Sequence, residues 1–182
     1  MTELTHLLVK RFEEASEDSF NKGIDWYDEA NEYAASIKDR YSLEQSASVI
    51  SHLSPRTRWN KNKEAAAQVI AGDIHSTGLF SSCVNRAILA LVTNDPLSTF
   101  NGKKTTSFVH NILGNHDYVT LDSWMLSITH PELTIKERNN FLNRAGKYDL
   151  ISDCFRYAAK YVDLKPAQLQ SILWVDIRGD HA

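Results

Sequence analysis

The residues best suited to chemistry in this chain are a lysine and an aspartate eighteen positions apart, Lys104 and Asp122. Lys104 lies in the run Gly102-Lys103-Lys104-Thr105. A glycine in the turn before a helix lets backbone amides approach a phosphate. The positive end of that helix and the neighbouring Lys103 both favour the neutral form of the Lys104 amine, which is a nucleophile. Asp122 could orient that amine, take its proton, or stabilise positive charge that develops on a sugar ring.

Both residues also have plain structural interpretations. Lys104 could be a phosphate contact or an exposed lysine at the start of a helix. Asp122 comes just before an expected helix, where an aspartate commonly caps the first backbone amides. These alternatives remain open at the level of the sequence.

A second candidate segment is the run Ser54-Pro55-Arg56-Thr57-Arg58-Trp59-Asn60. Arg56 and Arg58 supply guanidinium groups for phosphate binding, and Trp59 supplies an indole on which a base can stack. Trp59 could equally close over the hydrophobic core. Trp124 and Trp174 lie on apolar helical faces, and we expect them in the core rather than against a base.

Charge is distributed unevenly over the 182 residues, whose formal net charge is −3. Residues 1–44 hold eleven acidic and five basic residues, a balance of −6, so the rest of the chain sums to +3. Between Ser54 and Gly114, seven lysines and arginines stand against three acidic residues. This modest excess is compatible with a nucleic-acid-binding surface and equally with a solvated helix face.

Several classes of protein are excluded or disfavoured. Cys83 and Cys154 are the only cysteines, which leaves no disulfide framework and no thiolate cluster for zinc or iron–sulfur binding. The seven histidines are scattered, so we expect neither a metal site nor another cofactor. No apolar run reaches the ~18 residues that a membrane-spanning helix needs, and the first residues do not resemble a signal peptide. The expected location is the cytoplasm, without a membrane partner.

The apolar residues recur at helical spacing along almost the whole chain, which predicts a single all-α domain over residues 1–182 with about ten helices. Only Tyr118-Val119-Thr120-Leu121 is extended in character. Helix ends are marked by capping residues, glycines and a proline. The first two expected helices cover residues 4–15 and 26–41. The markers of helix starts and ends are capping boxes at Ser42-Leu43-Glu44-Gln45 and Thr134-Ile135-Lys136-Glu137, terminating glycines at 72, 114 and 146, and Pro166 at a helix start.

At the Lys104 and Asp122 segments, the sequence resembles the helix-hairpin-helix DNA glycosylases of the endonuclease III type. That family carries a hairpin of the form Leu-Pro-Gly-Val-Gly-Arg-Lys-Thr and, eighteen positions after its lysine, a catalytic aspartate. The matching hairpin here is Ser98-Thr99-Phe100-Asn101-Gly102-Lys103-Lys104-Thr105, within residues 98–112. Residues 49–57 resemble the Leu-Ser-Ala-Gln-Thr stretch on the DNA-facing side of the family's domain. The resemblance covers residues ~45–128.

The hairpin departs from the family at two positions. Thr99 replaces the proline and Phe100 replaces the first glycine, which alters the expected phosphate grip. The four-cysteine cluster of some members is absent, and with it their iron–sulfur cofactor. The chain also resembles small proteins of bacteriophages and actinobacteria over most of its length, which implies a family rather than an activity. The shared motifs are Leu53-Ser54-Pro55-x-Thr57-Arg58-Trp59, Gly102-x-Lys104-Thr105, Asp122-x-Trp124 and Pro166-x-x-Leu169-Gln170-x-Ile172-x-Trp174-Val175.

The glycosylase resemblance implies a DNA N-glycosylase-like hydrolase, with or without lyase activity, that acts during base excision on a flipped base, either ordinary or modified. Lys104 and Asp122 would then be catalytic. Six residues would contact DNA: Arg56, Arg58, Trp59, Gly102, Lys103 and Thr105. The alternative is a non-catalytic DNA-binding or host-interaction protein on the same scaffold, and an enzyme acting on RNA or free nucleosides is a third hypothesis. The sequence leaves open the base, the oligomeric state, the pathway and any protein partner.

Overall fold

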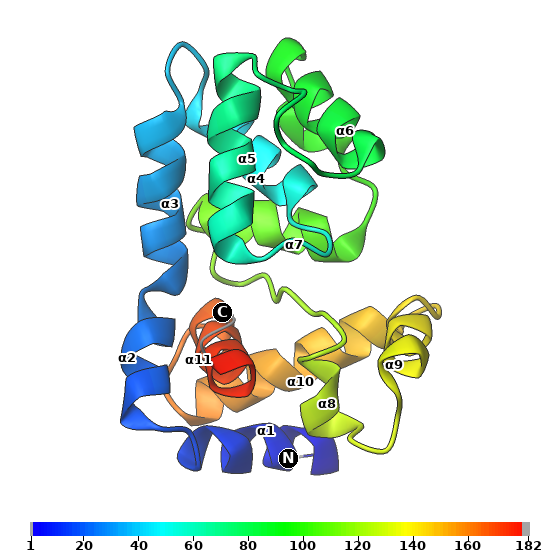
Figure 1. Cartoon of the computed structure of the whole chain (residues 1–182). Coiled ribbons are helices and arrows are strands. Elements are labelled where there is room, and N and C mark those ends of the chain that lie inside the picture. The colour runs from blue at the N-terminus through cyan, green and yellow to red at the C-terminus, as the bar shows by residue number, and fades with distance from the viewer. Residues whose placement is uncertain (1, 180–182) are drawn as a thin grey trace. The chain divides into compact units, whose positions relative to one another are not determined.

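The computed structural model describes residues 2–179, and helices joined by turns and irregular segments make up this part of the chain (Figure 1). This part contains no β-strand, which confirms the predicted all-α class. Its eleven α-helices and one 3₁₀ helix agree with the expected number of about ten. The elements are α1 (Glu3–Glu13), α2 (Glu17–Ile24), α3 (Trp26–Ile37), α4 (Leu43–Leu53), α5 (Trp59–Ala71), α6 (Ser81–Val92), the 3₁₀ helix η1 (Pro96–Thr99), α7 (Lys103–Ile112), α8 (Leu126–Thr129), α9 (Ile135–Leu142), α10 (Lys147–Tyr161) and α11 (Pro166–Arg178).

The chain divides into two compact units. The central unit is Asp28–Gly114, and the terminal unit is Met1–Tyr27 with Asn115–Ala182, described here over 2–27 and 115–179. The central unit contains seven of the eight predicted site residues, in its loops and helix starts. The eighth, Asp122, belongs to the terminal unit. The single domain expected over residues 1–182 stays a prediction.

Helix α4 forms the middle of the central unit, where it packs against α5, α6, α7 and η1 (Figure 1). Its start is the predicted capping box, in which the Gln45 amide donates to Ser42 Oγ at 3.1 Å and the Ser42 amide donates to Gln45 Oε1 at 2.9 Å. Every residue of α4 from Ser46 to Leu53 is buried. Helix α5 ends at Gly72, whose φ of 89° is the left-handed cap expected from the sequence.

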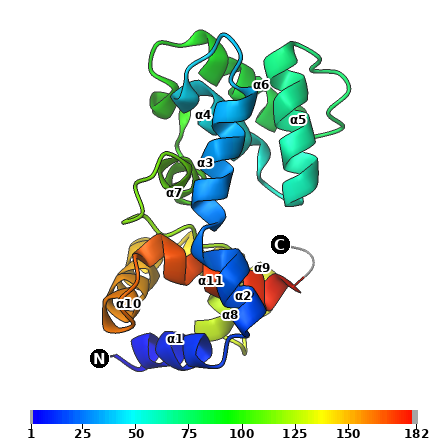
Figure 2. The ribbon, with the colours of Figure 1, turned by 90° about the vertical axis from the view of Figure 1, so that its left-hand side faces the viewer.

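Helix α11 occupies the middle of the terminal unit, where it packs against α1, α2 and α10 (Figure 2). Pro166 stands in its first turn, as predicted. Gly23 permits α2 to lie directly on α11, because a Cβ added there would meet the Ile172 Cα at 2.4 Å. The fully buried core includes Leu8, Met125, Leu126, Ile151, Phe155, Leu169 and Leu173.

Two local expectations need correction. The first forty residues form three helices rather than two, because Ser16 caps an additional helix, α2. Gly146 does not end the helix that starts after Thr134: α9 ends at Leu142, and Gly146, with φ 73°, is the residue before α10. The segment at Tyr118, extended in character but too short to found a sheet, makes no strand, as expected.

None of the helices described in residues 2–179 is long and apolar enough to cross a membrane.

Candidate nucleic-acid interface

The C-terminal end of α4 holds the hairpin segment in place. Ser51 Oγ donates to the Thr105 carbonyl at 2.7 Å, at the first turn of α7. One residue later, His52 Nε2 lies 2.7 Å from Thr99 Oγ1, and the His52 ring stacks on Phe100 with centroids 4.0 Å apart and planes 6° apart. Because α4 leads directly into the arginine-bearing turn at residues 54–58, both predicted DNA-facing segments meet at this one helix end.

The hydrogen bonds of Thr99 determine which ring nitrogen of His52 carries the proton. Thr99 donates its single hydroxyl hydrogen to the Pro96 carbonyl at 2.6 Å, so it must accept a hydrogen bond from His52 Nε2–H. His52 is only 4% exposed. Burial, with a smaller contribution from the charge of Arg86, lowers the pKa of His52 from 6.5 to about 4. The imidazole is therefore neutral near pH 7, with its proton on Nε2.

The two positions where the hairpin departs from the glycosylase pattern are the two that contact His52. Thr99 takes the place of the proline and accepts the His52 hydrogen bond, and Phe100 takes the place of the first glycine and stacks on the ring. A side-chain cluster thus fixes this turn. His52 was not among the predicted site residues, because its only signal in the sequence is a histidine at an inward position of an otherwise apolar and small-residue helix.

The turn that leads into α7 has ordinary backbone geometry. Gly102 precedes α7 with φ −105° and ψ 125°, a conformation open to any residue, and it gives no side-chain cap to the helix. Lys103 is exposed and Lys104 is half-buried. The Thr105 hydroxyl donates back to the Gly102 carbonyl at 3.1 Å, so its hydrogen is already used within the turn. The glycine is therefore not required by the backbone conformation.

The run from Ser54 to Thr57 is a β-turn closed by a hydrogen bond from the Thr57 amide to the Ser54 carbonyl at 3.2 Å. Pro55 occupies its second position, and Arg56, at the third position, has φ 61°. Arg56 and Arg58 are both exposed. The Arg56 guanidinium lies 5.8 Å from the ring centroid of Phe80, which is 57% exposed. Phe80 was not predicted as a site residue, since an isolated phenylalanine carries no signal of its own.

Trp59 and Arg86 are held by neighbours within the central unit. Trp59 is half-buried, packs edge-on against Tyr33 with centroids 6.2 Å apart, and has the Lys63 ammonium 5.6 Å from its ring centroid. This environment agrees better with the structural interpretation of Trp59 than with base stacking.

Arg86 donates to the Asn101 side chain at 2.9 Å, and this hydrogen bond connects α6 to the hairpin.

Asp122 caps a helical turn in the terminal unit. Its Oδ1 accepts hydrogen bonds from the backbone amides of Trp124 at 2.9 Å and Met125 at 3.0 Å, and the short helix α8 follows. Tyr148 fixes the preceding segment, because its hydroxyl donates to the Val119 carbonyl and accepts from the Leu121 amide. The cap that the sequence offered as an alternative is therefore present. Since Lys104 belongs to the other unit, the pairing of the two residues stays a prediction.

The side chain of Trp124 differs from the expectation of a core residue. It is 37% exposed, and the Arg178 guanidinium lies 4.9 Å from its ring centroid. Trp174 is half-buried, with its ring edge-on to Trp26 at 5.7 Å, as expected for a residue at the margin of the core.

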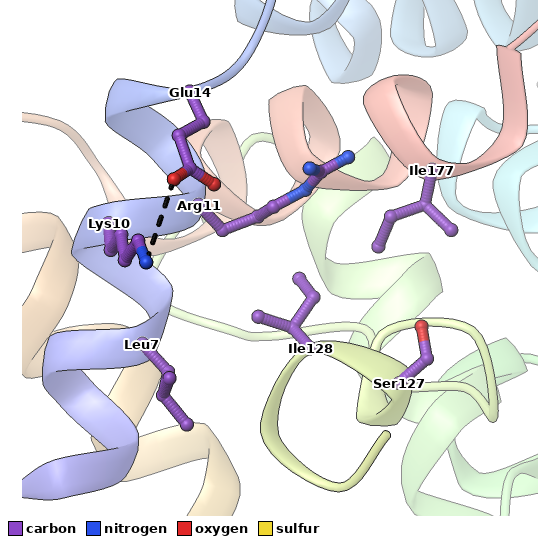
Figure 3. A pocket seen from close by; sticks show the side chains of 7 residues that line it. All are labelled: Leu7, Lys10, Arg11, Glu14, Ser127, Ile128 and Ile177. Atoms are coloured by element: carbon purple, nitrogen blue, oxygen red, sulfur yellow. Dashed lines mark ion pairs between the residues drawn. The ribbon is translucent and has the colours of Figure 1, made fainter. Parts of the chain in front are cut away.

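A cavity of about 350 Å³ lies in the terminal unit, and none of the predicted site residues lines it (Figure 3). Its lining combines apolar side chains with the Lys10–Glu14 ion pair, whose charged atoms are 3.8 Å apart. Arg11 extends across it and is paired with Asp176. The lining residues are Leu7, Lys10, Arg11, Glu14, Ser127, Ile128 and Ile177. The charges at this cavity are thus satisfied by one another.

Neither the cysteines nor the histidines gather into a ligand set in the part of the chain that the structure describes. Groups of three or more His, Cys, Asp or Glu residues placed for a metal ion do not occur there. Cys154 is buried and Cys83 is half-buried, and both are free thiols.

Comparison with known proteins gives a family without an assigned activity. The chain belongs to a family described as a family of unknown function, DUF7178, whose pattern matches residues 1–181. No curated protein and no solved structure matches the chain significantly.

Proposed function

We propose that this member of the DUF7178 family binds DNA through its central unit and acts as a DNA N-glycosylase-like enzyme. The observation that supports the proposal is the end of α4, where Ser51 and His52 hold the hairpin and the next residues form the turn that bears Arg56. Phosphate-binding groups from segments fifty residues apart are thereby carried by one rigid helix end. Exposed Arg56, Arg58 and Lys103 supply its positive charge.

The proposed reaction breaks the bond between a base and its sugar after the nucleotide has left the duplex. Flipping is required because a stacked base shields the anomeric carbon, and the few kcal/mol that it costs are offset by phosphate and stacking contacts. The neutral Lys104 Nζ forms a bond to C1′ while the C1′–N bond breaks, and the base leaves with that electron pair and takes up a proton from water. Asp122 accepts the proton that the lysine loses. Opening of the sugar ring then gives a Schiff base, from which strand cleavage can follow.

Borohydride trapping tests this chemistry directly. A duplex with an abasic site or a modified base is incubated with the protein and borohydride, which reduces the Schiff base to a stable adduct that migrates slowly on a denaturing gel. We expect an adduct with the natural protein and none with Lys104→Ala. Lys103→Ala is the matched control, because Lys103 is the neighbouring exposed lysine and its proposed role is phosphate binding without chemistry. This variant should weaken DNA binding and still form the adduct.

Asp122→Asn separates the catalytic role of the aspartate from its role as a cap. The asparagine oxygen can accept the same hydrogen bonds from the Trp124 and Met125 amides, so the fold should be retained. Loss of the negative charge should slow base release by orders of magnitude while DNA affinity stays nearly unchanged. Base release at the natural rate by this variant would remove Asp122 from the mechanism.

The second candidate is a non-catalytic DNA-binding or host-interaction protein on the same scaffold. The capping hydrogen bonds of Asp122 favour it, because they give this residue a structural role without chemistry. Absence of an adduct with every substrate tested, together with retained DNA binding, would select this candidate.

A further inference from the structure

We infer that Phe80 and Arg56 form a stacking site for an unpaired base, so that the preferred partner is DNA with an unstacked nucleotide rather than an intact duplex. This inference rests on the proposed DNA binding. The two side chains come from different segments, the turn after α4 and the residue before α6, and they meet with the guanidinium 5.8 Å from the ring centroid. An aromatic ring stacks bases of any sequence, and an adjacent arginine binds the phosphate or adds a cation–π contact.

The backbone conformation at Arg56 is unusual for an arginine. Three non-glycine residues in the described part of the chain have positive φ: Asp39, Arg56 and Asp163. Aspartate enters this region readily because its short side chain can bond locally, whereas arginine has no such compensation. In a turn with proline at its second position, the third position ordinarily carries glycine or asparagine. Arginine at φ 61° therefore accepts strain that places a guanidinium over Phe80.

Phe80 presents a ring that remains 57% exposed although Arg56 lies beside it. Phe80 directly precedes α6, and this helix contacts the hairpin about two turns later, where Arg86 donates to the Asn101 side chain at 2.9 Å and to the Thr99 carbonyl at 3.3 Å. Helix α6 therefore connects the Phe80–Arg56 pair to the hairpin that is proposed to grip phosphate. A strand bound at the hairpin has an aromatic surface and a cation on the adjacent helix end.

The chemistry of this pair favours unpaired bases over paired ones. In an intact duplex both faces of each base are covered by its neighbours, so the ring of Phe80 has no free surface to stack on. A bulged, mismatched or flipped nucleotide offers that surface, and stacking on an aromatic side chain strengthens binding about tenfold per base. The phosphate contacts of Arg58 and Lys103, in contrast, serve both kinds of DNA equally.

The test measures a ratio of affinities with the full chain. Fluorescence anisotropy gives the dissociation constants for a duplex with one bulged base and for the same duplex fully paired. The natural protein should prefer the bulged duplex about tenfold. Phe80→Ala should bring the ratio close to one with little change in affinity for the paired duplex, and Phe80→Trp should keep or increase the preference.

Val92→Ala is the matched control, because Val92 is an exposed apolar residue of the same helix, 73% exposed, at the end remote from Phe80. It should leave the ratio unchanged. A natural protein that binds both duplexes equally, or a Phe80→Ala variant that keeps the preference, would overturn the stacking site and leave the proposed DNA binding intact. Failure of the natural protein to bind either duplex would overturn both.

Discussion

A neutral, buried histidine holds the hairpin of the central unit, and its titration links pH to stability. The pKa of His52 is about 4 in the folded chain, against 6.5 for the ordinary value, because burial and Arg86 disfavour the charged ring. Below pH 6.5 the unfolded chain takes up a proton that the folded chain refuses. The neutral His52 ring therefore makes its full contribution to the stability of the folded chain above pH 6.5, and this contribution is lost as the pH falls toward 4.

Lowering the pH from 7.5 to 4.5 should therefore reduce the free energy of unfolding by about 2–3 kcal/mol through the titration of His52. His52→Gln keeps a donor toward Thr99 and removes the titration, so its urea unfolding free energy should change less over the same range. The comparison between the two proteins matters, because the pKa of His110 is also lowered, chiefly by burial. Identical pH profiles for both proteins would show that His52 does not sense the pH.

The strain at Arg56 makes a second residue-level prediction. Arg56→Gly relieves the unfavourable φ, which offsets the entropy that glycine adds to the unfolded chain and the lost contact with Phe80. Stability should stay within about 1 kcal/mol of the natural protein, while DNA affinity falls several-fold. Asp39→Gly, at φ 48° in the same unit, is the matched control and should not weaken DNA binding. Equal DNA affinity of Arg56→Gly and the natural protein would show that the strain serves no binding function.

Among single residues, side-chain contacts between near neighbours along the chain could be predicted from the sequence, whereas contacts between distant positions could not. The cap at Asp122 could be predicted because its partners are two and three residues away. The contact of His52 with Phe100 joins residues separated by almost fifty positions, and only packing brings them together. The exposure of Trp124 likewise depends on where α11 places Arg178.

At the level of the helix, the same contrast holds. The bounds of α4 and the end of α5 followed from a capping box and a glycine, which act through the backbone of their own segment. Helix α2 was missed because it is only eight residues long and has just two large apolar residues, Phe20 and Ile24. Its place is fixed instead by the close approach of Gly23 to Ile172, which no local pattern encodes.

Gly102→Ala tests whether the start of α7 receives a phosphate. The backbone at φ −105° accepts alanine, and the added methyl would meet only Thr105 Oγ1 at 3.3 Å, so stability should change by less than about 1 kcal/mol. DNA affinity should fall, because the methyl group blocks close approach to the backbone amides. Gly72→Ala has the opposite expectation: at φ 89° it should lose about 1 kcal/mol of stability without affecting DNA affinity of the folded protein. Unaltered DNA binding by Gly102→Ala would place the phosphate elsewhere.

The contact between α2 and α11 is the most sensitive helix packing of the terminal unit. In Gly23→Ala, a methyl group 2.4 Å from the Ile172 Cα would force two backbones apart, since no side-chain rotation can relieve that contact. We expect a loss of about 3 kcal/mol, measured by urea unfolding. Lys22→Ala changes the neighbouring exposed residue and should have a small effect. A Gly23→Ala protein as stable as the natural one would mean that the helices separate at little cost.

For the molecule as a whole, the charge distribution matters more than the net charge of −3. The acidic balance of −6 lies in residues 1–44, and half of it, five acids against two bases, falls in residues 28–44 of the central unit itself. The exposed Arg56, Arg58 and Lys103 follow later in the same unit. A chain of this net charge is repelled by DNA at long range, so binding must depend on a few short-range phosphate contacts. The expected salt dependence is consequently shallow and traceable to individual side chains.

That salt dependence gives the last prediction. Each phosphate contact releases condensed counterions and adds about 0.9 to the slope of log affinity against log salt concentration on duplex DNA. Arg58→Ala and Lys103→Ala should each reduce the slope by about that amount, and the double variant by about twice as much, because the two residues lie on separate segments and contact different phosphates. Lys160→Ala, an exposed lysine of the terminal unit, is the control for a general change in charge and should leave the slope unchanged. If the control lowers the slope as much as the two variants do, the DNA contacts do not belong to the central unit and the proposed interface is wrong.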